Sequence, residues 1–229
     1  MRRLAVVVPA MDEEATIGEL LDRIAGVRVP GYELFTVVVD DGSSDRTGEI
    51  SRGRGATVVR HEKNRGLGAA VRTGLRSAVE EGADLVAYLD ADLEYYPEDI
   101  PRLVEPILRG RADYVLGSRF RGESGVRGMR AYRWLGNHAF TALLVLLMRR
   151  PITDGQTGMR AFSREAAANA EIIHDYNYAQ VLTLDLVRKG YRLIEVPIRY
   201  RLREHGASFI SWRYPAKVLP AIWRELRSP

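Results

Sequence analysis

The stretch LVAYLDADLEYYP (residues 85–97) joins a run of apolar residues to a cluster of acids. Its first five residues are apolar without alternation, which is typical of a strand buried on both faces of a sheet. Asp90, Asp92 and Glu94 follow at the point where this strand would leave the core. The surrounding sequence has to distinguish a metal site from an ordinary polar turn.

Strand and helix patterns alternate over the first 120 residues. We expect strands at 4–9, 34–45, 56–61, 84–92 and 113–120, and helices at 13–25, 45–53, 68–81 and 97–109. This order predicts an α/β fold with a mostly parallel central sheet and helices on both faces. Ligands of such sheets bind at the carboxyl ends of the strands. Two acidic pairs are expected there, Asp40 with Asp41 and Asp90 with Asp92.

The pattern changes after residue 120. We expect a Gly- and Arg-rich loop at 121–133, an apolar helix at 131–148, a hairpin or loop at 153–163, a helix at 177–189 and a strand at 191–203. The tail at 213–226 is typical of an amphipathic helix. No internal repeat and no Ser/Pro-rich linker divides the chain, so we predict a single domain over residues 1–229.

The composition is that of an ordinary globular protein with a small excess of positive charge. The 229 residues carry a formal net charge of +4, and all but three of the 34 basic residues (Lys63, Lys189 and Lys217) are arginines. This balance favours an anionic partner such as a phosphate or an anionic lipid surface, but the excess is too small to indicate a nucleic-acid-binding protein. Cysteine is absent, which excludes disulfides and thiolate metal sites.

No segment predicts a membrane-spanning helix. Such a helix needs about 20 apolar residues, and the longest apolar run, AFTALLVLLM (139–148), is much shorter. The N-terminal MRRLAVVVPAM has a short apolar run followed at once by Asp12, Glu13 and Glu14, so we expect a buried strand rather than a signal peptide. We therefore expect a cytoplasmic protein that can still lie on a membrane surface.

Two interpretations fit the acids of the opening stretch. Alternating positions on an extended segment place Asp90 and Asp92 on one side, with Glu94 also within reach. Mg²⁺ and Mn²⁺ prefer oxygen ligands, and Mg²⁺ is commonly held by one or two carboxylates together with substrate phosphates. The alternative is a solvated turn that caps a helix beginning at Pro97. A second acidic pair at the end of a neighbouring strand favours the metal site.

Two further segments are candidates for contact with a nucleotide. In VVVDDGSSD (37–45) the acids can accept hydrogen bonds from a base or ribose, or the polar residues can simply cap the next helix. NRGLGAAVRTG (64–74) has Gly66 and Gly68, but Val71 stands where a dinucleotide-binding fingerprint requires a third glycine. We therefore reject nicotinamide binding, while a close approach of the Gly68 backbone to a nucleotide stays open.

Arginines gather near the ends of several predicted elements. Arginine binds phosphate through a bidentate fork, although a solvated surface role is the alternative for each of them. The residues concerned are Arg119, Arg127, Arg130, Arg133, Arg201 and Arg203. The apolar helix at 131–148 predicts core packing or a dimer face, and its flanking arginines also fit a helix that lies on an anionic membrane.

Seven motifs in order resemble those of family 2 glycosyltransferases with the GT-A fold, and most closely the subgroup of dolichol-phosphate mannose synthases and related polyprenyl-phosphate glycosyltransferases. They are VVVPAMDEEATI, VVVDDGSSDRT, NRGLGAAVRTG, DADLEYYPEDIP, LGSRF, DGQTGMRAF and EVPIRYRLREHGAS. The resemblance implies one GT-A-type, Rossmann-like domain. Within it, 1–120 would be the nucleotide-sugar half, 121–212 the acceptor half and 213–229 a C-terminal amphipathic helix.

The resemblance also implies a metal-dependent, inverting transfer of one hexose from a nucleotide sugar, of the GDP-mannose or UDP-glucose type, to a polyprenyl or dolichyl phosphate. The donor would contact Pro9, Ala10, Glu13, Asp41, Gly68 and Asp90, and Mg²⁺ or Mn²⁺ would be held by Asp90, Asp92 and Glu94. The acceptor phosphate or the diphosphate would be held by Arg119, Arg133, Arg203 and Ser208. Asp92 and Arg119 would act in catalysis, because negative charge develops on the departing diphosphate. The enzyme would work as a peripheral protein at the inner membrane face.

The sequence departs from the family pattern at Phe209, where the late motif usually has lysine at a position facing phosphate. The alternative is therefore the same fold acting on a hydroxyl of a soluble acceptor, which would need a general base. Asp154 is the candidate base by its position, although it can equally belong to a structural turn. A nucleotidyltransferase is disfavoured because PAMDEEAT, and not a Gly-rich loop, follows the first strand. A third alternative, from another class of protein, is a non-catalytic nucleotide-sensing module.

Overall fold

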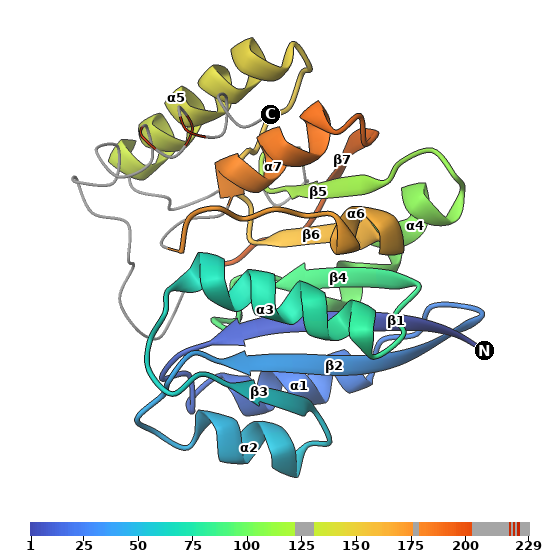
Figure 1. Ribbon diagram of the computed structural model, residues 1–229, viewed down its shortest axis with the longest axis vertical. Helices are drawn as coiled ribbons and strands as arrows, with labels where there is room; N and C mark the ends of the chain where they lie inside the picture. Colours follow the sequence, from blue (N-terminus) through green and yellow to red (C-terminus); the bar gives the residue numbers. More distant parts are fainter. Residues whose placement is uncertain (122–130, 176–178, 203–219, 221, 223, 225–229) are drawn as a thin grey trace.

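The structure is a computed structural model that describes residues 1–121, 131–175 and 179–202, together with 220, 222 and 224. The described residues form one seven-stranded sheet with helices on both faces (Figure 1). The strand order is β3-β2-β1-β4-β6-β5-β7. The predicted α/β fold with a mostly parallel central sheet is therefore confirmed.

The first half alternates strands and helices as the sequence predicts. It comprises β1 (Arg2–Ala10), α1 (Ile17–Ala25), β2 (Tyr32–Asp40), α2 (Thr47–Gly53), β3 (Thr57–Arg60), α3 (Leu67–Glu80), β4 (Leu85–Leu89), the short 3₁₀ helix η1 (Pro97–Asp99), α4 (Ile100–Leu108) and β5 (Tyr114–Ser118). β1 pairs in parallel with β2 and with β4, and β2 pairs in parallel with β3.

The second half adds an antiparallel strand to the interior of the sheet. It comprises α5 (Ala131–Met148), β6 (Met159–Ser163), α6 (Arg164–Ala168), α7 (Ala179–Arg188) and β7 (Leu193–Pro197). β6 lies between β4 and β5 and is antiparallel to both, whereas β7 is parallel to β5. The segment at 153–163, expected as a hairpin or loop, thus ends in a central strand. The terminal helix expected at 213–226 lies almost entirely outside the described residues.

Two hydrophobic cores cover the two faces of the sheet. Successive side chains of a strand point to opposite faces, so the continuous apolar run of β1 contributes to both. Val6 and Val8 belong to the core that includes residues of α1 and α4. Ala5 and Val7 belong to the core that includes residues of α3, α6 and α7. Figure 1 shows α3, α6 and α7 together in front of the sheet.

α5 lies at the periphery of the molecule (Figure 1). Leu144 packs into the core beside α7, whereas Trp134, Leu135 and Leu146 are 47%, 65% and 73% exposed. In the part of the chain that the structure describes, α5 and the other helices are too short or too polar to cross a membrane.

Candidate active site

The fold brings the predicted site motifs to one edge of the sheet. β1, β2, β4 and β5 end at this edge, and the antiparallel β6 begins there, because Leu89 at the end of β4 pairs with Met159 at the start of β6. The loop that precedes β6 therefore meets the loops that follow the other strands. The predicted site residues at this edge are Pro9, Ala10, Asp41, Asp90, Arg119 and Asp154.

Asp90 occupies a confined position at the carboxyl end of β4. Its Oδ1 accepts a hydrogen bond from the Tyr88 hydroxyl, and its backbone N–H donates to the carbonyl of Gly158 at 3.2 Å. A Cβ atom on Gly158 would overlap Oδ2 of Asp90. Burial is the main cause that raises the pKa of Asp90 to about 7, and the negative charges of Asp92 and Glu94 add to this effect. A cation bound beside Asp90 would favour its ionised form.

The chemistry of these acids fits a divalent cation that the substrate helps to bind. Asp92 is half-buried and Glu94 is buried, and both act on Asp90 through their charge. No three Asp, Glu or His side chains among the described residues converge closely enough to hold a metal ion by themselves. A cation here would complete its shell with phosphate oxygens and water, as Mg²⁺ commonly does. The ligand set Asp90, Asp92 and Glu94 stays a prediction.

Asp41 is held at the end of β2 by residues from the loop before α3. Its Oδ1 lies 2.6 Å from Nδ1 of His61, and its two oxygens accept the backbone N–H groups of Arg65 at 2.9 Å and Gly66 at 2.8 Å. Nε2 of His61 lies 3.0 Å from the Thr73 hydroxyl. These contacts fix the orientation of the carboxylate, which suits an acid that would orient a nucleoside.

The loop after β1 is tied to the loop after β2. The backbone N–H of Asp41 donates to the Ala10 carbonyl at 2.9 Å, and that of Glu13 donates to the Thr47 hydroxyl at 2.8 Å. Pro9 and Ala10 are buried, whereas Glu13 is half-buried. The four residues predicted to hold the nucleoside thus lie along one connected part of the edge, and their contacts with a donor stay a prediction.

Gly68 makes a close approach to the chain itself. Its backbone N–H donates to the Asp175 carbonyl at 2.7 Å, and a Cβ atom would overlap the carbonyl oxygen of His174. This packing by itself accounts for glycine at the start of α3, with no need for a bound nucleotide. The predicted donor contact of Gly68 is not needed to account for the residue.

Arg119 and Asp154 form a buried bidentate ion pair. Nε of Arg119 lies 2.7 Å from Oδ2 and Nη2 lies 2.8 Å from Oδ1 of Asp154. Asn137 of α5 adds a longer bond to Oδ1 at 3.4 Å. Burial alone would raise the pKa of Asp154, but the charge and hydrogen bonds of Arg119 outweigh it and lower that pKa. In this arrangement Asp154 is a weak base, and the fork of Arg119 is engaged by a carboxylate.

Of the other candidate phosphate-binding arginines, Arg201 is described, and its Nε donates to the Leu93 carbonyl. The remaining predicted phosphate-binding side chains lie outside what the structure describes. Arg133 belongs to the first turn of α5, where the backbone is described and the side chain is not. Arg203 and Ser208 lie in the segment 203–219, and Arg127 and Arg130 lie in 122–130, both outside the described residues. Their phosphate contacts stay predictions.

Tyr95 is a central residue of the site that lies in the motif DADLEYYPEDIP but was assigned no role from the sequence. Its hydroxyl accepts the backbone N–H of Gly158 at 2.7 Å, and its ring meets the Tyr200 ring edge-on at 5.8 Å. The guanidinium of Arg119 lies 5.3 Å from the centre of the Tyr200 ring. Tyr95 therefore joins the loop after β4 to the loop before β6 and to the segment after β7.

Arg160, the second residue of β6, lies in the motif DGQTGMRAF but was also assigned no role from the sequence. Its side chain is fully buried and donates to the carbonyls of Thr157 at 3.0 Å, Ala179 at 3.2 Å and Gly155 at 3.3 Å. It thereby shapes the loop that begins at Asp154. Apart from its place in that motif, Arg160 stands out only as an arginine inside an apolar segment, which by itself indicates a surface strand as readily.

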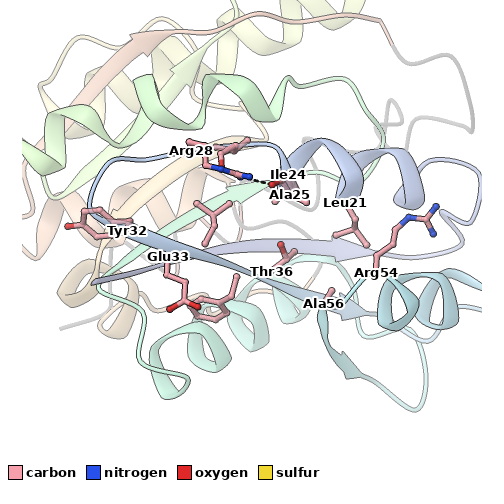
Figure 2. Close-up of a pocket in the computed structure, with 13 residues that line it drawn as sticks. Leu21, Ile24, Ala25, Arg28, Tyr32, Glu33, Thr36, Arg54 and Ala56 are labelled. Atoms are coloured by element: carbon pink, nitrogen blue, oxygen red, sulfur yellow. Dashed lines mark hydrogen bonds between the residues drawn. The ribbon is translucent and has the colours of Figure 1, made fainter. Parts of the chain in front are cut away.

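A cavity of about 390 Å³ lies away from this edge. It is lined by α1, by the first residues of β2 (32–36) and by residues 54–56 before β3. Figure 2 shows Arg28 at this cavity, where its Nη1 donates to the Ala25 carbonyl at 2.7 Å. No predicted site residue lines the cavity, so the candidate active site is the edge with the acids.

Residues 5–169 match the family model described as glycosyl transferase family 2. The chain belongs to this family. The matched segment contains the acids at the end of β4, Asp41, and the Arg119–Asp154 pair. The family predicted from the seven motifs is therefore confirmed, and the protein is a glycosyltransferase.

Three relatives illustrate what the chain is similar to. It is 36% identical over 203 residues to a dolichyl-phosphate hexose transferase of Haloferax volcanii, covering 87% of this chain and 83% of the relative. It is 30% identical over 218 residues to an undecaprenyl-phosphate mannosyltransferase of Micrococcus luteus, covering 91% and 88%. It is 29% identical to a dolichol-phosphate mannosyltransferase of Pyrococcus furiosus, covering 98% of this chain and 64% of the relative.

Solved structures with the same fold include a glucosyl-3-phosphoglycerate synthase of Mycobacterium tuberculosis. Its complex with Mn²⁺ and UDP-glucose has a TM-score of 0.78 and 25% identity, and covers all of this chain and 80% of the synthase. Its complex with phosphoglyceric acid has the same TM-score and identity, and covers 81% of the synthase. The likeness confirms the GT-A-type fold predicted for this chain.

Proposed function

We propose that this glycosyltransferase moves one hexose from a nucleotide sugar to a polyprenyl phosphate, with inversion at the sugar and with a divalent metal. The observation that carries the proposal is the placement of Asp90, Asp92 and Glu94 at the carboxyl end of β4, where burial, reinforced by the charges of Asp92 and Glu94, raises the pKa of Asp90 to about 7. The Mn²⁺ and UDP-glucose named for the mycobacterial synthase support the metal and the donor. The names of the Haloferax and Micrococcus relatives support the lipid phosphate.

The residues at this edge of the sheet would bind the donor and place its anomeric carbon within reach of the acceptor. Asp41 would orient the nucleoside, and Asp90 and Asp92 would hold the cation. A bound metal supplies positive charge that neutralises the departing diphosphate. A phosphate oxygen of the acceptor would attack the anomeric carbon, and the bond from that carbon to the diphosphate would break with its electron pair on the diphosphate. The acceptor is already an anion, so a strong general base is dispensable.

The pairing of Asp154 favours a phosphate acceptor over a neutral hydroxyl. A general base needs an accessible lone pair and a pKa near the working pH. Asp154 is fully buried, its oxygens accept from Arg119, and its pKa is lowered. In the described conformation it would act as a positioning group, and its role as a base for a soluble acceptor is the weaker proposal.

The exposed face of α5 supports work at a membrane surface. Leu135, Ala139, Ala142 and Leu146 are all exposed and follow one another at intervals of four, three and four residues. At this spacing they form one stripe along the helix. No Asp or Glu occurs from residue 124 to 153, while arginines flank the helix at both ends. An apolar stripe between basic ends suits an anionic lipid surface.

A second candidate is transfer to a soluble, phosphorylated acceptor. The mycobacterial synthase of the same fold is named for such an acceptor and was crystallised with phosphoglyceric acid. An acidic small molecule would bind to the same arginine-rich acceptor half (121–212). Such an acceptor would not explain the exposed apolar stripe of α5.

The test is transfer from UDP-glucose, UDP-GlcNAc, UDP-galactose and GDP-mannose with Mn²⁺ or Mg²⁺, with and without a short-chain polyprenyl phosphate. Asp92→Asn is the metal-site variant, and Asp22→Asn, on an exposed residue of α1 away from the edge, is its matched control. We expect metal-dependent turnover of one donor that requires the lipid phosphate and disappears only in Asp92→Asn. Turnover with phosphoglyceric acid alone would establish the second candidate. Failure of every donor to bind in the presence of metal would refute the assignment of this edge of the sheet as the donor-binding site.

A further inference from the structure

The turn between Asp92 and Glu94 has a backbone conformation that a branched side chain rarely adopts. Leu93 has φ of +60°, in the left-handed region that favours glycine. The N–H of Glu94 donates to Oδ1 of Asp92 at 3.1 Å, so the turn also sets the direction of that carboxylate. A residue in such a conformation persists only where its surroundings hold it there.

Arg201 supplies contacts that hold this turn. Its backbone N–H donates to the Glu94 carbonyl at 2.9 Å, and Nε of its guanidinium donates to the Leu93 carbonyl. Nη2 of the same guanidinium lies 3.5 Å from Glu19 on α1. One residue therefore binds two successive carbonyls of the turn and connects them to a helix on the face of the sheet.

The segment that carries Arg201 is anchored by its neighbours. Tyr200 forms an isolated antiparallel bridge with Tyr95, and their rings pack edge-on. Arg199 pairs with Asp99, with Nη2 2.8 Å from Oδ1 and the backbone N–H 2.7 Å from Oδ2. Shortening Arg201 would therefore leave the segment in place and remove the side-chain donor to Leu93.

We infer that Arg201 is a positioning residue, which keeps the turn at Leu93 in the shape that presents Asp92 and Glu94 to the metal and the diphosphate. The inference rests on the proposed function, because it assumes that a cation binds at these acids. Arg201 acts through backbone carbonyls and touches no reacting atom. Groups outside the ligand shell that orient metal ligands typically change metal affinity by about 10- to 100-fold when they are removed.

The experiment is calorimetric titration of Mn²⁺ into the protein saturated with UDP or, in a parallel series, with GDP. Arg201→Met keeps most of the apolar stem and removes all guanidinium donors, and Arg201→Lys keeps the charge without Nε. Arg199→Met is the matched control, because Arg199 faces the same Tyr96 ring and does not contact the turn. The variant keeps the backbone N–H of residue 199 on Asp99, which still anchors the segment. We expect Arg201→Met to weaken Mn²⁺ binding about 10- to 100-fold, Arg201→Lys to weaken it less, and Arg199→Met to bind like the unmodified protein.

A second measurement separates positioning from a general loss of structure. In transfer assays Arg201→Met should need more Mn²⁺ for half-maximal rate and regain most of kcat at saturating Mn²⁺. Thermal unfolding of the metal-free variants monitors folding, and if Arg201→Met does not fold, the Arg201→Lys titration decides.

The outcomes separate the inference from the proposed function. Absence of Mn²⁺ binding to the unmodified protein with either nucleotide would overturn the metal-dependent function itself. Normal binding by the unmodified protein, with equal affinity in the Arg201 variants, would overturn the role of Arg201 alone. Equal weakening in Arg199→Met and Arg201→Met would also overturn it, because the effect would then belong to the cluster around Tyr96.

Discussion

The guanidinium of Arg119 and the carboxylate of Asp154 meet through two hydrogen bonds of 2.7 and 2.8 Å in the interior of the protein. Each was expected to act separately, Arg119 on a phosphate and Asp154 as a base. As partners they instead hold the end of β5 against the loop that leads to β6. Any role that either plays in catalysis therefore begins from this pair.

Removing Asp154 should destabilise the protein. Asp154→Ala would leave the charge of Arg119 buried without its partner, and the loss of one member of a buried ion pair typically costs about 3–5 kcal/mol of unfolding free energy. Asp154→Asn should cost less, because its amide oxygen still accepts a hydrogen bond. Urea unfolding checks both. A variant with unchanged stability and abolished transfer to a hydroxyl acceptor would favour the role of Asp154 as a base.

Acid should weaken the same contact. Because the folded pKa of Asp154 is lowered, its contribution to stability is present above the pKa of the unfolded chain and is lost as the pH falls through the folded value. We expect the difference in unfolding free energy between the unmodified protein and Asp154→Asn to shrink below pH about 4. A difference that stays constant down to pH 2 would contradict the assigned pKa direction.

Asp90 should produce the opposite pH dependence in the metal-free protein. Its pKa is raised from 3.8 to about 7, so the protonated form stabilises the fold at low pH and this contribution is lost as the pH rises toward 7. Asp90→Asn, which is neutral at every pH, should melt above the unmodified protein at pH 8 and approach it near pH 4. Mn²⁺ should raise Tm at pH 8 only in the unmodified protein. Parallel Tm curves from pH 4 to 8 would contradict this prediction.

Gly158 should not tolerate a side chain. Gly158→Ala would place a methyl group on Oδ2 of Asp90 and 2.9 Å from the Tyr95 ring, so we expect loss of transfer activity together with weaker Mn²⁺ binding. Gly136→Ala on α5 is the control, because a Cβ there meets nothing within 4 Å. That control should keep activity and gain about 0.5–1 kcal/mol of stability, as alanine replaces glycine in a helix. Activity retained in Gly158→Ala would show that Asp90 can move freely.

The exposed stripe of α5 should bind anionic lipid. Leu146→Glu introduces a charge at a side chain that is 73% exposed, so it should leave folding unchanged and weaken sedimentation with vesicles of phosphatidylglycerol. Leu108→Glu, at a 40% exposed leucine at the end of α4, adds the same charge elsewhere and should bind vesicles like the unmodified protein. If both variants lose lipid binding equally, the effect is one of net charge and not of α5.

The predictions of secondary structure are right where the pattern is local, and they miss the strand β6. The apolar runs of β1, β2 and β4 are long enough to indicate buried strands, and the acids at their ends mark the active edge. β6 has five residues, MRAFS, with Arg160 at its second position. A buried arginine in a central strand is tolerated only when distant groups satisfy it, and here these include the carbonyl of Ala179. No local pattern contains that information.

The sequence by itself determined the alternation of strands and helices, the family, and the edge at which the acids gather, because periodicity and strand ends are local properties of the chain. Only the tertiary structure decided that Arg119 engages Asp154 and that Arg201 reaches the Leu93 carbonyl. These contacts join residues 35 and 108 positions apart. A buried charge or carbonyl takes whichever partner the folded chain brings to it, so such pairings arise from packing and are absent from the pattern of residues along the chain.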